Sequence, residues 1–259
     1  SILRAYMWID QTDKEKYERL LHFFEALAAF TATVHLSAYR QEPSRWETTR
    51  KEITDQLARN SLSFERTTFG VWRTILNATA PMTRALVNGS DEDKRLCRTL
   101  YCAEDLEPIA AMSSKKLLSI LEQTNTYRNR WPAHGGSVTK EEATQRLRAV
   151  ENQVEELRKR FGSIFLGYEL LEPLTTALLP APIYRYDALR VMGSNPLLER
   201  TIVELEHPVF SGYLCFLSPG NSRALQLEPV FQVQDAPQPA CYFFNRMEGG
   251  NPRYVAYGL

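Results

Sequence analysis

Residues 127–136, Tyr-Arg-Asn-Arg-Trp-Pro-Ala-His-Gly-Gly, place an imidazole six positions after a guanidinium. Arg128 can hold a phosphate through two parallel hydrogen bonds, and His134, with an ordinary pKa near 6.5, can move a proton at neutral pH. Asn129 adds a neutral donor and acceptor beside them. Pro132 interrupts a helix, and the two glycines after the histidine permit a tight turn and close approach of a ligand. These residue types fit phosphate chemistry, although they also fit a helix–helix loop with surface arginines and a capping histidine.

The rest of the chain offers less for catalysis. His22 and His35 are thirteen residues apart on one predicted helix, about 20 Å, so they cannot share a metal and we interpret both as packed or surface histidines. His207 precedes Pro208 at a predicted turn. Nucleophile motifs, phosphate-binding glycine loops and metal-ligand spacings are missing from the sequence, so we predict no cofactor and no metal.

Helices must position the Arg-Asn-His segment, because the first 170 residues show apolar residues three and four apart. Pro43 ends the first predicted helix, and Ser44 with Glu47 predicts a capping box for the second. Thr139 with Glu142 predicts another before the last helix, and Pro81 predicts a kink or break. The predicted helices cover residues 17–39, 44–57, 69–87, 91–101, 113–127 and 139–161.

The pattern changes after Pro173, because ten of the fourteen prolines lie from that residue onward. Short β-favouring runs alternate with turn signals there, without helices between them, which predicts antiparallel strands. The predicted strands cover residues 183–192, 200–206, 212–217, 224–233, 240–247 and 253–257. We therefore predict an α+β protein with two domains, a helical bundle over residues 1–170 and a β-rich domain over residues 171–259.

Composition narrows the function classes. The 31 Lys and Arg balance the 31 Asp and Glu, so nucleic-acid binding must come from a local basic patch. No apolar run reaches the roughly 18 residues of a spanning helix, and the first residues do not resemble a signal peptide. The four scattered cysteines indicate a reducing compartment, so we expect a cytoplasmic protein with no membrane partner.

Arg128-Asn129, four intervening residues and His134, between the penultimate and last helices of an all-α bundle, resemble the signature of the HEPN superfamily. The resemblance covers about residues 14–170. Pro132 within the intervening stretch departs from the pattern, and Gly136 stands where some toxin members carry a tyrosine. The resemblance does not extend to the β-rich part.

The resemblance implies a metal-independent endoribonuclease whose active site is shared by two copies of the domain. His134 would be the general acid and base, Arg128 would stabilise charge on the phosphate, and Asn129 would orient the pair. The RNA 2′-hydroxyl would attack the adjacent phosphate. Because the chain carries one such motif, activity would require a homodimer, and the biological role would be that of a host-defence or toxin-like effector with a sensor domain or partner protein.

Supporting residues follow from the chemistry. Glu25 lies in an apolar string where an unpaired carboxylate would be unfavourable to bury, and Arg128 is a suitable partner, although a solvent-facing Glu25 is an equal alternative. Some HEPN members use such an acidic residue from an earlier helix. The remaining candidates for contact with RNA are Arg130, Lys115, Lys116, Arg158 and Trp131, each of which also fits a solvated surface or a packing role.

Two alternatives from other classes stay open. A non-catalytic HEPN module would use the same face for dimerisation and for protein or nucleotide binding within a larger defence or sensor protein. Alternatively, the β-rich part is an interaction domain and the helical bundle is its dimerisation base.

Overall fold

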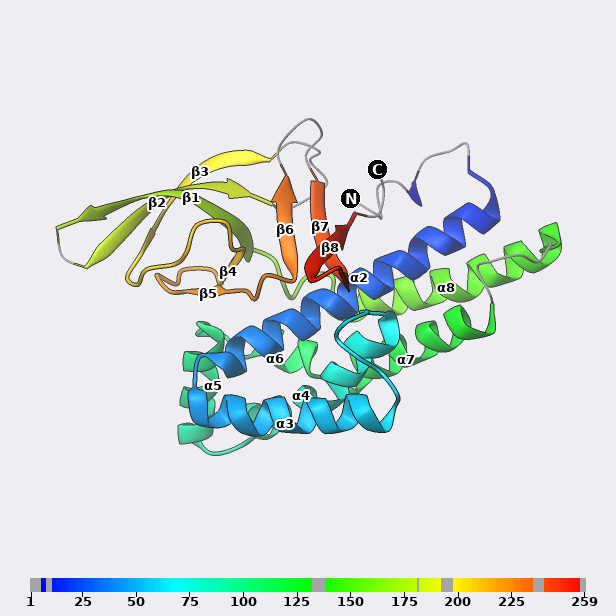
Figure 1. The fold of residues 1–259 in the computed structure, drawn as a ribbon, viewed down its shortest axis with the longest axis horizontal. Coiled ribbons are helices and arrows are strands. Elements are labelled where there is room, and N and C mark those ends of the chain that lie inside the picture. Colours follow the sequence, from blue (N-terminus) through cyan, green and yellow to red (C-terminus); the bar gives the residue numbers. More distant parts are fainter. Residues whose placement is uncertain are drawn as a thin grey trace.

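The protein is an α+β fold with helices first and antiparallel strands after them (Figure 1). The computed structural model describes residues 6–7, 11–131, 138–180, 182–191, 198–234 and 240–256. Its helices are α2 (Asp13–Arg40), α3 (Pro43–Arg59), α4 (Phe69–Asn88), α5 (Asp91–Tyr101), α6 (Glu107–Met112), α7 (Lys115–Arg130) and α8 (Lys140–Phe161).

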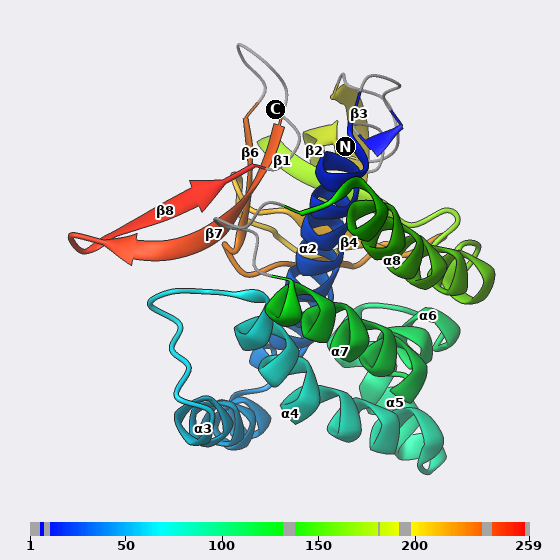
Figure 2. The same cartoon turned by 90° about the vertical axis from the view of Figure 1, so that its right-hand side faces the viewer.

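Helix α2 is the central element. It lies between the sheets and the other helices in both views (Figures 1 and 2). By length and composition α2 could cross a membrane, but 72% of its most apolar window is buried inside this fold, as in the core helix of a soluble protein. Its buried hydroxyls bond to carbonyls one turn back, as Thr33 does to Ala29 at 2.8 Å, so they add no unsatisfied polar group.

The helix boundaries confirm some predicted caps and correct others. The Thr139 hydroxyl accepts from the Glu142 backbone N–H at 3.2 Å, so the predicted cap of α8 is confirmed. The predicted Ser44 cap is wrong, because Pro43 is already the first residue of α3 and its N-cap is Glu42. Proline fits the first helical turn, where its missing N–H is not needed. Helix α4 continues through Pro81 rather than breaking there.

The strands form two antiparallel sheets. The first has the order β3-β2-β1-β4-β5 and the second the order β6-β7-β8. Their bounds are β1 (Glu169–Leu179), β2 (Ile183–Arg190), β3 (Glu199–Leu205), β4 (Cys215–Leu217), β5 (Ala224–Gln226), β6 (Phe231–Gln234), β7 (Ala240–Glu248) and β8 (Asn251–Val255). Turns at Pro219–Gly220 and Gly249–Gly250 join β4 to β5 and β7 to β8.

Strand β1 was not predicted, because Pro173 lies inside it. The register of β1 against β2 shifts between Pro173 and Thr175. A proline cannot donate to the ladder, and a bulge is one of the few places where a sheet tolerates it. The first sheet therefore begins two residues before the predicted boundary at 170/171.

One hydrophobic core extends across that boundary. Phe216 of β4 stacks on Tyr168 at 4.9 Å between ring centroids and meets Phe30 of α2 edge-on at 5.7 Å. The Glu228 backbone N–H donates to the Ser37 hydroxyl at 2.8 Å. The change of secondary structure near residue 170 therefore does not separate the packing of the two parts.

Candidate functional site

Arg128 lies in the last turn of α7 and forms an ion pair with Glu25 of α2, with 3.5 Å between Nη2 and Oε2. The Glu25 side chain is 4% exposed and the Arg128 side chain 34% exposed. Of the two alternatives for Glu25, the structure shows the buried carboxylate paired with Arg128. His134 lies outside the described residues, as do Pro132 and the two glycines that follow the histidine.

His22 belongs to the same cluster. It lies one turn before Glu25 on α2, and residues three apart share a face of a helix. Burial first, and then the charges of Arg128 and Arg19, lower the pKa of His22 to about 4. The His22 imidazole is therefore neutral at pH 7. The sequence interpretation of His22 as a packed or surface residue missed its closeness to Arg128, for which the spacing to Glu25 was the only signal.

Asn129 and Arg130 are exposed in the last turn of α7, next to Arg128. Because both side chains face solvent, they are available to a ligand that approaches this end of the helix. Helix α7 ends at Arg130, and the Trp131 backbone N–H caps it by donating to Tyr127 at 2.9 Å.

Trp131 is held within the fold by three residues. Its ring stacks on Tyr127, with 4.7 Å between centroids and 7° between planes, and meets Tyr17 edge-on at 6.1 Å. The Arg146 guanidinium lies 5.4 Å from the Trp131 ring centroid. These contacts favour the packing role of Trp131 over stacking on a base.

Arg146 is the second residue that sequence reasoning missed. It lies on α8, is only 8% exposed, donates to the Tyr17 hydroxyl at 3.3 Å and forms an ion pair with Glu142. An arginine among charged residues on an amphipathic helix gives no sequence signal of burial. The contacts of Arg146 hold the Tyr17 and Trp131 rings in place.

Lys115, Lys116 and Arg158 lie away from this cluster. Lys116 is twelve residues before Arg128 on α7, which is about 18 Å along the helix. Lys116 pairs with Glu156 of α8 at 3.2 Å, and Arg158 pairs with Glu155 at 3.0 Å. The structure therefore brings Glu25, His22, Arg130 and Trp131 to the Arg128 end of α7, and places Lys115, Lys116 and Arg158 at the opposite end.

The two other described histidines have structural contacts. His35 is fully buried, its Nδ1 is hydrogen-bonded to the Tyr101 hydroxyl, and burial lowers its pKa to about 4. Thr83 joins this network through a 2.9 Å bond to Tyr101. His207 bonds to the Ala224 carbonyl at 3.0 Å through Nε2. Neither histidine contacts the Arg128 cluster.

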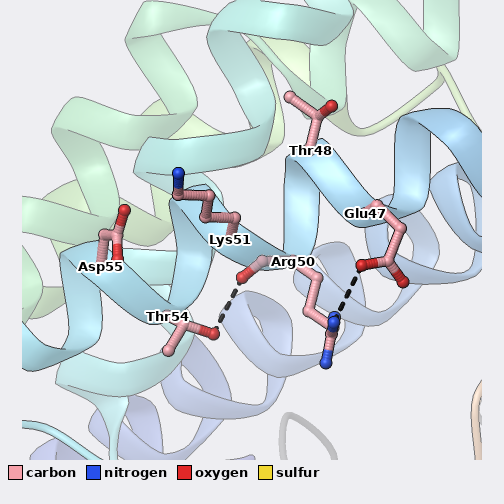
Figure 3. A pocket seen from close by; sticks show the side chains of 6 residues that line it. All are labelled: Glu47, Thr48, Arg50, Lys51, Thr54 and Asp55. Atoms are coloured by element: carbon pink, nitrogen blue, oxygen red, sulfur yellow. Dashed lines mark hydrogen bonds and ion pairs between the residues drawn. The ribbon is translucent and has the colours of Figure 1, made fainter.

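A hollow of about 520 Å³ lies over α3 (Figure 3). Its six lining residues are exposed and all come from this one helix: Glu47, Thr48, Arg50, Lys51, Thr54 and Asp55. Arg50 pairs with Glu47 at 2.8 Å, and the Thr54 hydroxyl donates to the Arg50 carbonyl at 2.9 Å. The hollow is therefore a feature of a solvated helix face.

Across the described part of the chain, no three His, Cys, Asp or Glu side chains gather in a group that could hold a metal ion. The arrangement around Arg128 instead offers a positioned guanidinium, a buried carboxylate that orients it and a neutral imidazole beside them. Comparison of the chain with family models, with curated proteins and with solved structures finds no match.

Proposed function

We propose that the protein is a metal-independent endoribonuclease of the HEPN type, active as a homodimer and acting as a host-defence or toxin-like effector. The observation that carries the proposal is the Glu25–Arg128 ion pair. A buried carboxylate fixes the guanidinium at the end of α7, directly before the segment that carries His134. Side chains locked in this way are what a preorganised phosphate site requires.

The chemistry follows from the residue types. Arg128 would stabilise negative charge on the phosphate during attack by the RNA 2′-hydroxyl. His134 of one protomer would accept the proton of that hydroxyl, and the histidine of the other protomer would donate a proton to the leaving 5′-oxygen. Asn129 would orient the scissile group through its amide. The products would be a 2′,3′-cyclic phosphate and a 5′-hydroxyl.

The His22–Glu25–Arg128 geometry supports an anionic substrate rather than a cationic one. The low pKa of His22 keeps this imidazole uncharged, so His22 does not compete with Arg128 for the charge of Glu25. The Glu25–Arg128 ion pair then orients the guanidinium. Arg130, exposed one turn from Tyr127, adds a second positive charge at the same end of α7. The basic residues at the far end of α7 are not needed for this site.

The test is incubation of the purified chain with single-stranded RNA in EDTA, followed by mapping of the cut ends. Cleavage should continue in chelator, and a 2′-O-methyl group at the cut site should block it. His134→Ala should lower the rate by about 10²–10⁴, the usual range for loss of a general acid or base. Arg128→Lys keeps the charge but loses the planar fork, so it should lower the rate by about 10²–10³.

His207→Ala is the matched control, because His207 lies in the β-rich part and should leave the rate unchanged. If His134→Ala cleaves as fast as the wild type, or if a divalent metal proves essential, the nuclease proposal is wrong. A chain that binds RNA, nucleotide or protein through the Arg128 face without cutting RNA would instead be the non-catalytic HEPN module.

A further inference from the structure

An apolar cavity of about 320 Å³ lies between α2 and α8. Phe23, Leu27 and Phe30 of α2 form one wall, and Val154, Leu157 and Phe161 of α8 face them across it. Met112, Leu117 and Phe165 also contribute to the lining. Except for Met112 and Leu117, these apolar side chains are half-buried, so the cavity remains open to solvent.

The cavity differs from the α3 hollow because four helices (α2, α6, α7 and α8) and the segment after α8 enclose it. Apart from Arg158, the polar side chain in its lining is Thr31, whose hydroxyl already donates to the Leu27 carbonyl at 2.8 Å. A volume near 300 Å³, apolar walls and one charged residue are typical of a small-molecule site between helices. At roughly 30 Å³ for a group the size of water or methylene, the cavity holds a chain of about ten carbons.

Basic residues are concentrated at the start of α7 and the end of α8, on the Arg158 side of the cavity. Arg158 belongs to the lining and is 75% exposed, and Lys159 and Arg160 follow it at the end of α8. Lys115 and Lys116 begin α7, and Lys116 reaches α8 through its bond to Glu156. Residues 115–116 and 155–160 carry five cations and two carboxylates, and four of the five cations pair with Glu155 or Glu156.

We propose that this cavity binds a single-chain amphiphile with an anionic head group, such as a medium-chain fatty acid. The chain would lie between the phenylalanines of α2 and α8, and the head would bond to Arg158, which would exchange Glu155 for the ligand. The site is separate from the Arg128 cluster and does not depend on the proposed nuclease function.

A second copy of the chain fits the cavity less well. A two-fold interface places the same patch of both copies face to face. A cavity on the two-fold axis would meet its own copy and stay empty, whereas a flexible chain of about ten carbons fills a volume of this size.

The experiment is calorimetric titration of the full chain with decanoate. Decanoate should bind with a dissociation constant on the order of 100 μM. Octanoate, two methylene groups shorter, should bind about tenfold more weakly. Decyltrimethylammonium, with the same chain and a cationic head, should also bind about tenfold more weakly because Arg158 repels it.

Two sets of variants test separately the apolar cavity, which would hold the alkyl chain, and Arg158, which would bind the head group. Leu27→Trp fills the cavity from α2 and should abolish binding, and Val154→Phe fills it from α8 and guards against a failure of the first variant to fold. Arg158→Glu should weaken decanoate binding about tenfold. Arg148→Glu changes the same net charge on the exposed face of α8, ten residues or about 15 Å before Arg158, so it should change the constant by less than about twofold in 0.15 M salt.

Three results would overturn the proposal. The first is that titration with about 1 mM decanoate releases or absorbs no heat, which places the dissociation constant well above 1 mM. The second is equal binding of the anionic and cationic probes. The third is a change from dimer to monomer in sedimentation of Leu27→Trp, which would show that a second copy covers the cavity.

Discussion

The Glu25–Arg128 pair should be coupled energetically much more strongly than a surface ion pair. Glu25→Gln removes the negative charge at nearly constant volume, and Arg128→Gln removes the positive charge. At 3.5 Å and an effective dielectric constant of 20, the Coulomb attraction is about 5 kcal/mol. Arg128 is 34% exposed, so solvent screening and the desolvation of Glu25 reduce the net coupling to about 1–2 kcal/mol.

The assay is a double-mutant cycle in urea at pH 7, with unfolding of the wild type, both single variants and the double variant. The matched control is the same cycle on Glu47 and Arg50, which lie closer at 2.8 Å but are 66% and 61% exposed. That pair should show a coupling below about 0.5 kcal/mol. A Glu25–Arg128 coupling as small as the control would refute the inference that burial of Glu25 fixes Arg128.

Three further predictions concern stability. Because the folded pKa of His35 is about 4 and the unfolded value 6.5, the unfolded state alone takes up a proton as the pH falls through this window. Stability should therefore be full above pH 6.5 and fall toward pH 4, with about 3 kcal/mol of the fall due to His35 and a further part due to His22. His35→Gln should remove the His35 part of this decline in urea midpoints measured against pH. Trp131→Ala should lower the free energy of unfolding by about 2 kcal/mol, because the half-buried ring packs on Tyr127 and Arg146; unchanged stability with weakened RNA binding would assign the ring to RNA instead. Phe216→Ala should lower it by about 3–5 kcal/mol, and circular dichroism should show helices and strands unfolding in one transition, whereas two separate transitions would contradict a shared core.

Hydrophobic spacing predicted most helices, because each long helix buries one face against α2 or its neighbours. It failed where a local residue overrode the pattern. It missed the short α6, and Ser114, which caps α7 by accepting from the Leu117 backbone N–H, places the start of the predicted helix 113–127 at Lys115. Strand β1 was hidden because Pro173 is accommodated by a shift of register, a property of the pairing with β2 rather than of β1 itself.

The candidate site likewise has a part that the sequence indicated and a part that depends on how the helices pack. The partner of Glu25 was one of two alternatives open from the sequence, because a carboxylate in an apolar string either faces solvent or needs a cation such as Arg128, and the structure shows the second. The place of His22 beside Arg128 depends on how α2 and α7 cross, which the spacing of His22 to Glu25 indicates only once Glu25 is known to pair with Arg128. The separation of Lys116 and Arg158 from Arg128 likewise follows from the antiparallel packing of α7 on α8, which brings the start of one helix to the end of the other.

Helix α2 connects the core to the candidate site. Its apolar face holds the bundle and the sheets together, and the same helix carries His22 and Glu25. Glu25 therefore stands on a helix whose buried residues extend from Tyr17 to Tyr39, which makes the backbone behind the Arg128 anchor rigid. Arg128 itself remains one-third exposed, so its guanidinium can meet a phosphate while the carboxylate behind it stays in place. Rigidity on the carboxylate side and access on the solvent side are the two conditions under which an arginine stabilises a transition state without reorganising.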